Sequence, residues 1–215
     1  MIFLAITTSP QRSTEREDNI FLRGGGEMGK LIRAKDWENT ALGDPSTWPQ
    51  PLKTMVGVLL ENPFGMYIAW GKEFTQIYND GYRPILGATK HPQALGNSTK
   101  ETFSEIWPII GPMLDGVMEG EAVRFSDLML PLNRNGYLEN CYFDFSYSPI
   151  RLATGEVGGV LVTVIETTSK KIAENDLIEN KNDLEFVIEA AQLGTYDYNP
   201  LTNTFSGNAR LKEWF

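Results

Sequence analysis

The alternation of side chains between residues 123 and 166 constrains this chain more than any other feature of its sequence. From Tyr137 to Tyr147, aromatic or apolar side chains occupy almost every second position, which is the period of a β-strand with one aromatic face. The preceding Asn135-Gly136 pair is a β-hairpin turn signal, so Val123–Leu132 is predicted to be the partner strand. Val157–Glu166 is apolar on both faces, which predicts a central strand covered on both sides.

Helix and strand patterns upstream of these strands supply further elements. Apolar side chains recur at helical spacing across Pro51–Glu61, which predicts an amphipathic helix. Gly65–Trp70 and Phe74–Tyr78 are short extended runs that are predicted to form a hairpin. Gly81–Leu86 then predicts one or two helical turns that stop at the following glycine, before a polar loop over residues 88–100.

Apolar side chains from Phe103 to Val117 again keep helical spacing, but this stretch contains Pro108, Gly111 and Pro112. Because a proline inside a helix removes a hydrogen bond and crowds the preceding turn, we expect two helical pieces around a break. The order of elements is then a helix, a hairpin, short helices and three strands. This order predicts an α+β fold, in which one antiparallel sheet has its helices gathered on one face.

Four segments carry a more specific pattern: WGKEFTQIYNDGYRPILG, FSEIWPIIGPMLDGVMEG, LPLNRNGYLENCYFDFSYSPI and GGVLVTVIETT. In this order they resemble the PAS domain, in particular the N-terminal sensor PAS domain of bacterial sensor histidine kinases. The resemblance covers residues 28–168 and rests on the ordered combination of the four segments. It implies a five-stranded antiparallel sheet with short helices on one face, preceded by the amphipathic helix and followed by a linker helix.

The flanking segments are predicted to lie outside this PAS domain. Residues 1–27 are expected to be a disordered arm or a mis-assigned start, because Arg23–Glu27 is what a purine-rich ribosome-binding site would encode and Met28 follows it. Residues 192–215 have the order strand, Asn-Pro turn, strand and short helix, which predicts the start of a second, truncated PAS domain. Half a domain cannot bury its core, so we expect the chain to be a fragment of a longer receptor.

The segment 169–191 is charged and has apolar positions at alternating spacings of four and three residues. This pattern is typical of a coiled-coil seam and predicts a parallel homodimer through a helical linker. The seam residues are Ala173, Leu177, Asn180, Leu184 and Val187. A buried Asn180 would fix the register of the two helices at a cost in stability. The alternative is a solvated linker helix whose leucines pack on their own chain.

Composition narrows the possible partners and cofactors. The net charge of −9 predicts a surface that repels phosphate backbones and anionic lipids, so neither nucleic acid nor direct membrane contact is expected. No apolar run approaches the ~20 residues that span a bilayer. The single cysteine cannot form a disulfide within the chain, and the single histidine excludes any metal site that needs two imidazoles. We therefore expect a cytoplasmic protein with no metal and no evident cofactor.

No residue of the sequence stands in a recognisable catalytic arrangement. His91 precedes a proline in the predicted loop and is expected to be exposed. Cys141 lies on a predicted strand, which favours a small buried hydrophobic residue over the flavin-reactive cysteine of light-sensing relatives. Gly158-Gly159 lies inside a strand and indicates a bulge or a close approach of two backbones. We therefore expect a non-catalytic sensor fragment.

The PAS resemblance implies a ligand cavity between the sheet and the short helices. The candidate pocket residues are Tyr78, Tyr82, Trp107, Met113, Phe143, Phe145 and Tyr147. The alternative is a core that these side chains fill completely. Asn79 or Asp80 is expected to cap the helix that follows the hairpin, without binding ligand.

The function expected from this resemblance is signal input. The domain would bind a small ligand or a partner and relay a conformational change through the linker to an output module, a histidine kinase of a two-component system. The sensor domain of a diguanylate cyclase would have the same appearance in the sequence. A flavin- or haem-bearing photoreceptor or redox sensor is the competing class.

Overall fold

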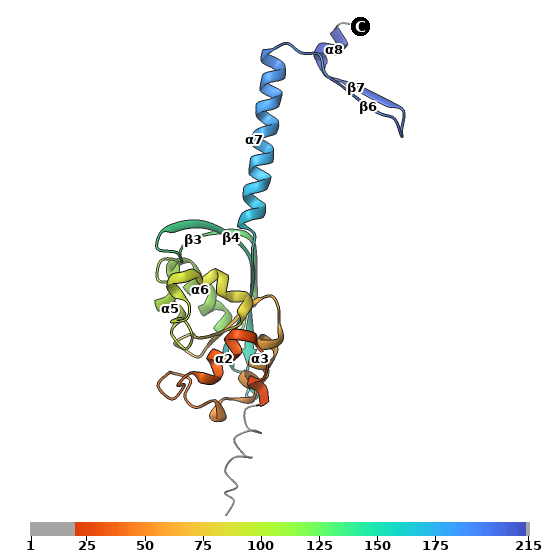
Figure 1. The fold of residues 1–215 in the computed structure, drawn as a ribbon. Helices are drawn as coiled ribbons and strands as arrows, with labels where there is room; N and C mark the ends of the chain where they lie inside the picture. The colour runs from red at the N-terminus through yellow and green to blue at the C-terminus, as the bar shows by residue number, and fades with distance from the viewer. Residues whose placement is uncertain (1–19, 214–215) are drawn as a thin grey trace, which may run out of the picture. The chain divides into compact units, whose positions relative to one another are not determined.

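The computed structural model describes residues 20–213, and the chain divides into two compact units between Thr167 and Thr168 (Figure 1). The first unit is built on five strands: β1 (Gly65–Trp70), β2 (Thr75–Tyr78), β3 (Val123–Asn133), β4 (Leu138–Arg151) and β5 (Val157–Glu166). They form one sheet in the order β2-β1-β5-β4-β3, and every neighbouring pair is antiparallel. The predicted α+β fold with one five-stranded antiparallel sheet is confirmed.

Within residues 20–213, four helices cover the inner face of this sheet, and one helix covers part of the outer face. The inner helices are η3 (Asp80–Tyr82), α4 (Arg83–Lys90), α5 (Thr99–Thr102) and α6 (Trp107–Met118). On the outer face lies α3 (Gln50–Glu61), whose Met55 lines a shallow groove together with Leu161 of β5. The apolar stripe of α3 includes Leu52 and Val56, which are fully buried, so the predicted amphipathic helix is confirmed.

β5 is less covered on its outer face than its sequence predicts. The inward side chains Val160, Val162 and Val164 are buried, but Leu161 is only partly buried and Ile165 is 50% exposed. A helix of 12 residues is about 18 Å long, so α3 covers only part of the outer face and leaves the end of β5 open. The prediction that β5 is covered on both faces is wrong at this end.

Residues 20–27 pack against the sheet unit, in contrast to the prediction that the chain up to residue 27 lies outside the fold. Leu22, in η1 (Ile20–Leu22), is buried, and α2 (Gly26–Ala34) buries Met28 completely. The backbone between these helices turns through Gly24 and Gly25, whose positive φ angles of 76° and 74° favour glycine. A further short helix, η2 (Pro45–Thr47), precedes α3. Residues 1–19 lie outside the described residues.

α6 is a single helix, which corrects the predicted break at its prolines. Pro108 lies in the first turn of the helix, where a backbone N–H would have no hydrogen-bond partner within the helix. A proline there therefore costs no helical hydrogen bond. Pro112 does interrupt the hydrogen-bond ladder, but the helix continues because its apolar face is buried. Gly111 permits a close approach of the Trp107 ring, since a Cβ atom there would lie 2.8 Å from Cε2 of that ring. In α4, the helical backbone is interrupted at Gly87 as predicted, because its φ of 59° and ψ of −158° are not helical.

The side chain of Asn79 joins three segments at the point where β2 ends. Its Oδ1 atom accepts hydrogen bonds from the backbone N–H groups of Met66 at 3.0 Å and Tyr82 at 3.1 Å, so it is the N-cap of η3. Its Nδ2 atom donates to three carbonyl oxygens at 2.8–3.2 Å, those of Leu59, Asn62 and Phe64. Asp80 caps a different helix, because its carboxylate accepts from the N–H groups of Glu27 and Met28 at the start of α2.

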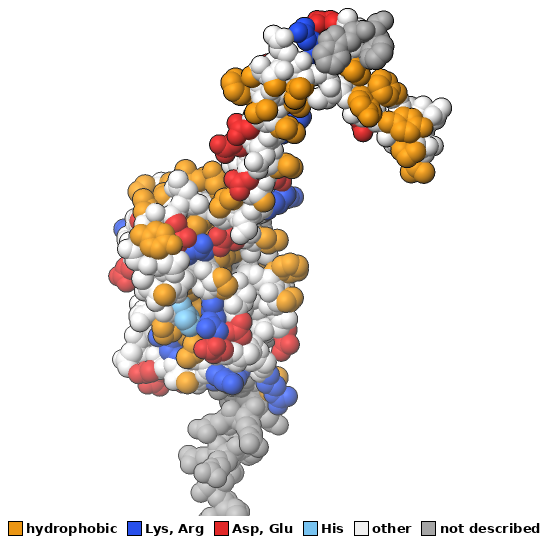
Figure 2. All heavy atoms as spheres, turned by 45° about the horizontal axis from the view of Figure 1, so that its top comes forward, with side chains coloured by type: hydrophobic (Ala, Val, Ile, Leu, Met, Phe, Trp, Pro, Cys, Tyr) orange, Lys and Arg blue, Asp and Glu red, His pale blue; other side chains and the backbone are white. Residues whose placement is uncertain are grey.

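The second unit consists of a long helix followed by a hairpin and a short helix. α7 (Thr168–Ala190) contains no buried residue, and β6 (Tyr196–Asn199), β7 (Thr204–Gly207) and α8 (Ala209–Glu213) follow it. Tyr196 and Phe205 stack across the hairpin with ring centroids 5.6 Å apart, and both stay exposed. Figure 2 shows hydrophobic side chains in orange on the surface of this unit. Within residues 20–213, no helix combines the length and apolarity that crossing a membrane requires.

Replacing Asn79 by Ala is expected to lower the free energy of unfolding by about 3 kcal/mol, because buried donors and acceptors lose their partner. Replacing Asp80 by Ala is expected to cost only about 1 kcal/mol, the usual value of a helix N-cap at a partly exposed position. Chemical denaturation of the two variants measures both losses. Equal losses would show that the Asn79 network stabilises the fold no more than an ordinary cap does.

A tyrosine-lined cavity as the candidate functional site

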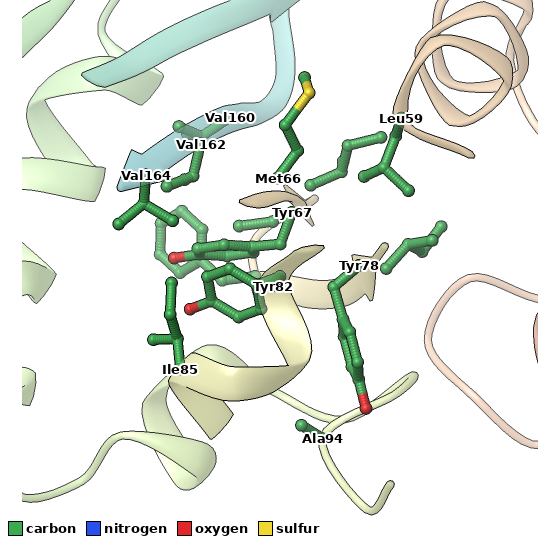
Figure 3. Packing of buried hydrophobic residues seen from close by; sticks show 14 of the residues in the cluster. Leu59, Met66, Tyr67, Tyr78, Tyr82, Ile85, Ala94, Val160, Val162 and Val164 are labelled. Carbon is green, nitrogen blue, oxygen red and sulfur yellow. The ribbon is translucent and has the colours of Figure 1, made fainter. Parts of the chain in front are cut away.

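A cavity of about 40 Å³ lies between the inner face of the sheet and the short helices. Three tyrosines line it, Tyr67 of β1, Tyr82 of η3 and Tyr147 of β4. The rest of its wall is apolar: Ile85, Phe103, Ile106, Ile110, Leu130, Leu132, Phe143, Phe145, Val162 and Val164. Figure 3 shows the rings of Tyr67 and Tyr82 side by side, with both hydroxyl groups on the side of Val164 and Ile85. The cavity therefore has an apolar wall with phenol hydroxyls as its polar groups.

The cavity wall contains four of the seven pocket residues predicted from the sequence: Tyr82, Phe143, Phe145 and Tyr147. The other three do not line it. The side chain of Tyr78 points away from the cavity, toward the chain around Ala94 (Figure 3). Trp107 packs against Phe74, with ring centroids 5.9 Å apart, and Met113 is a partly buried residue at the edge of the core.

Sequence reasoning missed Tyr67 because it lies on a strand that is buried on both faces. Such a strand has no alternation that distinguishes inward from outward side chains. The helical part of the wall had a usable signal, since Phe103, Ile106 and Ile110 share one stripe at helical spacing. The missing information was that this stripe faces the aromatic side of β4.

All three cavity tyrosines are held in their neutral form. Burial raises the pKa of Tyr67, and hydrogen bonding to Thr99 and Tyr147 offsets only part of that effect. Burial also raises the pKa of Tyr82 and Tyr147, and the neighbouring phenols raise it further because two phenolates would repel each other. The wall contains no Asp, Glu, Lys, Arg or His side chain. The cavity is therefore uncharged at neutral pH.

The volume of the cavity limits the ligands that it accommodates. An apolar cavity that holds a benzene ring, with its six non-hydrogen atoms, has a volume of about 150 Å³, so one of about 40 Å³ holds only about one or two non-hydrogen atoms. Neither the three-ring system of a flavin nor the macrocycle of a haem fits this space. Cys141 is buried on β4 outside the cavity wall. Among residues 20–213, no three His, Cys, Asp or Glu side chains are grouped as a metal site.

Arg134 connects the helices around the cavity to the end of β5. Its guanidinium donates to both carboxylate oxygens of Glu166, at 2.7 Å each, and to the carbonyl oxygen of Pro84 at 3.1 Å. Its Nε atom donates to Glu139 at 3.3 Å. The pairing with Glu166 raises the pKa of Arg134 above its already high value. Pro84 precedes the cavity residue Ile85, and Glu166 is the last residue of β5, two residues before α7 begins.

His91 is only partly exposed, in contrast to the exposed loop residue that the sequence predicts. Its Nδ1 atom lies 2.9 Å from the hydroxyl oxygen of Tyr78. Partial burial and the nearby Arg83 guanidinium lower the pKa of His91. This histidine belongs to the packing around Tyr78 and lies outside the cavity wall.

No family model and no curated protein matches this chain. Among solved structures, an RNA-binding light-oxygen-voltage receptor is 12% identical over 63% of this chain and 37% of its own length, with a TM-score of 0.43. A sensory box sensor histidine kinase from Vibrio cholerae is 15% identical over 52% of this chain and 88% of its own, with a TM-score of 0.38. The PAS domain of Bordetella pertussis BvgS is 18% identical over 61% of this chain and 97% of its own, with a TM-score of 0.39. The five-stranded antiparallel sheet with its short helices is a PAS-like fold.

Four of the eight tyrosines are expected to resist ionisation for as long as the protein stays folded. They are the buried Tyr67, Tyr78, Tyr82 and Tyr147, whose pKa values burial raises above the ordinary value of about 10. These groups stay protonated in the fold but ionise in the unfolded chain, so stability is expected to fall as pH rises above about 10.

Ultraviolet absorbance follows phenolate formation, and circular dichroism follows the fold in the same titration. The four buried tyrosines are expected to form phenolate only as the native circular dichroism signal is lost. A full phenolate signal in protein that keeps its native circular dichroism would contradict the buried cluster.

Proposed function

We propose that this chain is a signal-input module, in which the cavity binds a small ligand and the change passes through Arg134 and Glu166 to α7. One observation carries this proposal. The Arg134 guanidinium binds the carbonyl oxygen next to the cavity residue Ile85 and also the carboxylate at the end of the strand that leads into α7. A single side chain thereby joins the backbone beside the cavity to the end of β5.

A ligand would act first on η3 and α4, which are short and carry Tyr82 and Ile85 into the cavity wall. The carbonyl of Pro84 belongs to the same peptide unit as the N–H of Ile85, so a displacement of Ile85 also moves the oxygen that Arg134 binds. The pair between Arg134 and Glu166 is bidentate and therefore directional. A shift at Arg134 would loosen or reorient the end of β5 and the start of α7.

The proposed output is a histidine kinase of a two-component system, for which this chain is the non-catalytic, cytoplasmic sensor part. α7 would carry the change toward that output, because it follows directly on the end of β5. A flavin or a haem is not part of this proposal, since the cavity has no room for either.

Replacing Arg134 by Gln is expected to raise amide exchange about tenfold at the end of β5 and in the first turn of α7, because the bidentate pair is lost. Hydrogen–deuterium exchange measures this effect directly. The matched control is Arg151→Gln, because the Arg151 guanidinium donates to the loop carbonyls of Gly120 and Gly155. Unchanged exchange at the end of β5 in Arg134→Gln would contradict the proposed connection.

A parallel homodimer through α7 completes the proposal. Along the seam of Ala173, Leu177, Asn180, Leu184 and Val187, the two leucines are 71% and 61% exposed in the single chain. Since α7 has no buried residue of its own, pairing with a second copy would remove this apolar stripe from water. A dimer would also present two copies of α7 to one output module.

The double variant Leu177→Lys with Leu184→Lys is expected to be monomeric, because the seam would have to bury four charged side chains per dimer. The control Asn175→Lys with Asn182→Lys adds the same charge on the opposite side of the helix and is expected to stay dimeric. Light scattering gives the mass of each protein in solution. A single mass shared by the wild type and both variants would contradict a dimer through this seam.

A further inference from the structure

Residues 91–98, which we call the edge loop, pair with the outer edge of β2. β2 is the last strand in the order of the sheet, so its second edge has no strand beside it. The N–H group of Gln76 in β2 donates to the carbonyl oxygen of Asn97 at 3.0 Å, and the carbonyl oxygen of Gln76 accepts from the N–H group of Gly96 at 2.8 Å. Leu95 is 3% exposed. The edge loop is therefore packed into the fold, although it lies between the end of α4 and the start of α5.

The residue that pairs with the edge loop has an incomplete set of hydrogen bonds. Gln76 is 0% exposed, and its Nε2 atom donates to the hydroxyl of Thr102 at 2.7 Å. Its Oε1 atom has no hydrogen-bond partner among the described residues. A buried acceptor without a donor is unfavourable, whereas water would donate to it once the edge loop had moved away. The closed position of the edge loop therefore has a cost that opening removes.

The first residue of the edge loop, His91, binds the hydroxyl of Tyr78, whose side chain points toward the chain around Ala94 (Figure 3). The hydroxyl oxygen lies 2.9 Å from Nδ1 of His91 and 3.5 Å from the carbonyl oxygen of Pro92. Because a phenol has one proton to donate, the shorter distance assigns it to Nδ1, which accepts only when it carries no proton itself. With a proton on Nδ1, the phenol proton would have only the Pro92 carbonyl, at a distance too long for a good hydrogen bond. The geometry therefore fits the neutral imidazole.

The charged groups around His91 also disfavour an imidazolium. Partial burial and the guanidinium of Arg83 in α4 hold the pKa of His91 below its ordinary value of about 6.5. The carboxylates of Glu27 in α2 and Asp80 in η3 act in the opposite direction. Both already pair with Arg83, with nitrogen–oxygen distances of 2.6 Å and 3.5 Å, and Asp80 also accepts from the first N–H groups of α2. They therefore offset only part of the opposing effects.

We infer that the edge loop is a pH-sensitive element, which the neutral imidazole of His91 holds closed against Tyr78 and which protonation of that imidazole releases from the edge of β2. In the open loop the imidazolium is hydrated, so the proton is bound more tightly there than in the closed loop. By linkage, opening therefore increases as pH falls. This inference goes beyond the proposed function and adds proton concentration as a second input. It is independent of the cavity, whose wall includes no residue of the edge loop.

Hydrogen exchange of the full chain, measured for single amides by nuclear magnetic resonance, reports opening of the edge loop. The amides to follow are those of Gln76 and Gly96, because pairing with the edge loop protects both. After correction for the intrinsic effect of pH on exchange, their protection is expected to fall about three- to tenfold between about pH 8 and pH 5.5. Protection in the β4–β5 pair is expected to stay unchanged. The chain has one histidine, so its imidazole signals give the titration of His91 in the same samples.

Two variants assign the effect to the contact between His91 and Tyr78. His91→Asn is the matched control, because its amide oxygen still accepts from the phenol but does not titrate. Its Gly96 protection is expected to stay high over the whole pH range. Tyr78→Phe removes the phenol hydroxyl and is expected to lower Gly96 protection already at pH 8. It is also expected to raise the pKa of His91, because the neutral imidazole loses its hydrogen bond.

Three results would overturn the inference. Constant Gly96 protection while the wild-type imidazole titrates would show that the edge loop does not respond to His91. The same pH dependence in His91→Asn would assign the response to another group, such as Asp80 or Glu27. A wild-type imidazole that titrates at or above pH 6.5 would show that the closed loop does not disfavour the charged form. None of these results would affect the proposed function of the cavity.

Discussion

The buried side chain of Asn79 determines where the helices around the cavity begin, and the arrangement of the first unit depends on this point. One amide binds the end of α3, the start of β1 and the N–H group of Tyr82. The outer helix, the sheet and the cavity are therefore held in one relative position. Because Asn79 is 1% exposed, water does not compete for these hydrogen bonds. The hydrogen bond from the Tyr82 N–H to Asn79 fixes where η3 begins, and Tyr82 enters the cavity from this turn.

Much of this fold could be predicted from the sequence because its strands and its outer helix have clear periods. The alternation along β4, the Asn135-Gly136 turn and the apolar stripe of α3 each follow from elementary geometry. The errors came from tertiary context. Burial keeps α6 intact across Pro112, and contacts distant in sequence fold residues 20–27 onto the sheet unit. Neither effect leaves a local pattern in the sequence from which it could be predicted.

The candidate site was less predictable than the fold, for a similar reason. The aromatic face of β4 led to Phe143, Phe145 and Tyr147, but a strand buried on both faces concealed Tyr67. Arg134 stands in a polar turn, where an arginine ordinarily indicates only a solvated surface. Its contacts to Pro84 and Glu166 span 50 and 32 residues of sequence, so no local spacing could have indicated them. Side chains that connect distant segments become evident only in three dimensions.

In the proposed function, occupancy of the cavity changes the start of α7 through Arg134. Amide exchange in the first two turns of α7, with and without xenon under pressure, tests this step most directly in the wild type and in Arg134→Gln. Xenon is expected to change exchange there in the wild type but not in the variant, although it shifts the methyl signals of Val162 in the cavity wall in both. An identical change in both proteins, or no change in a wild type that binds xenon, would contradict transmission through Arg134.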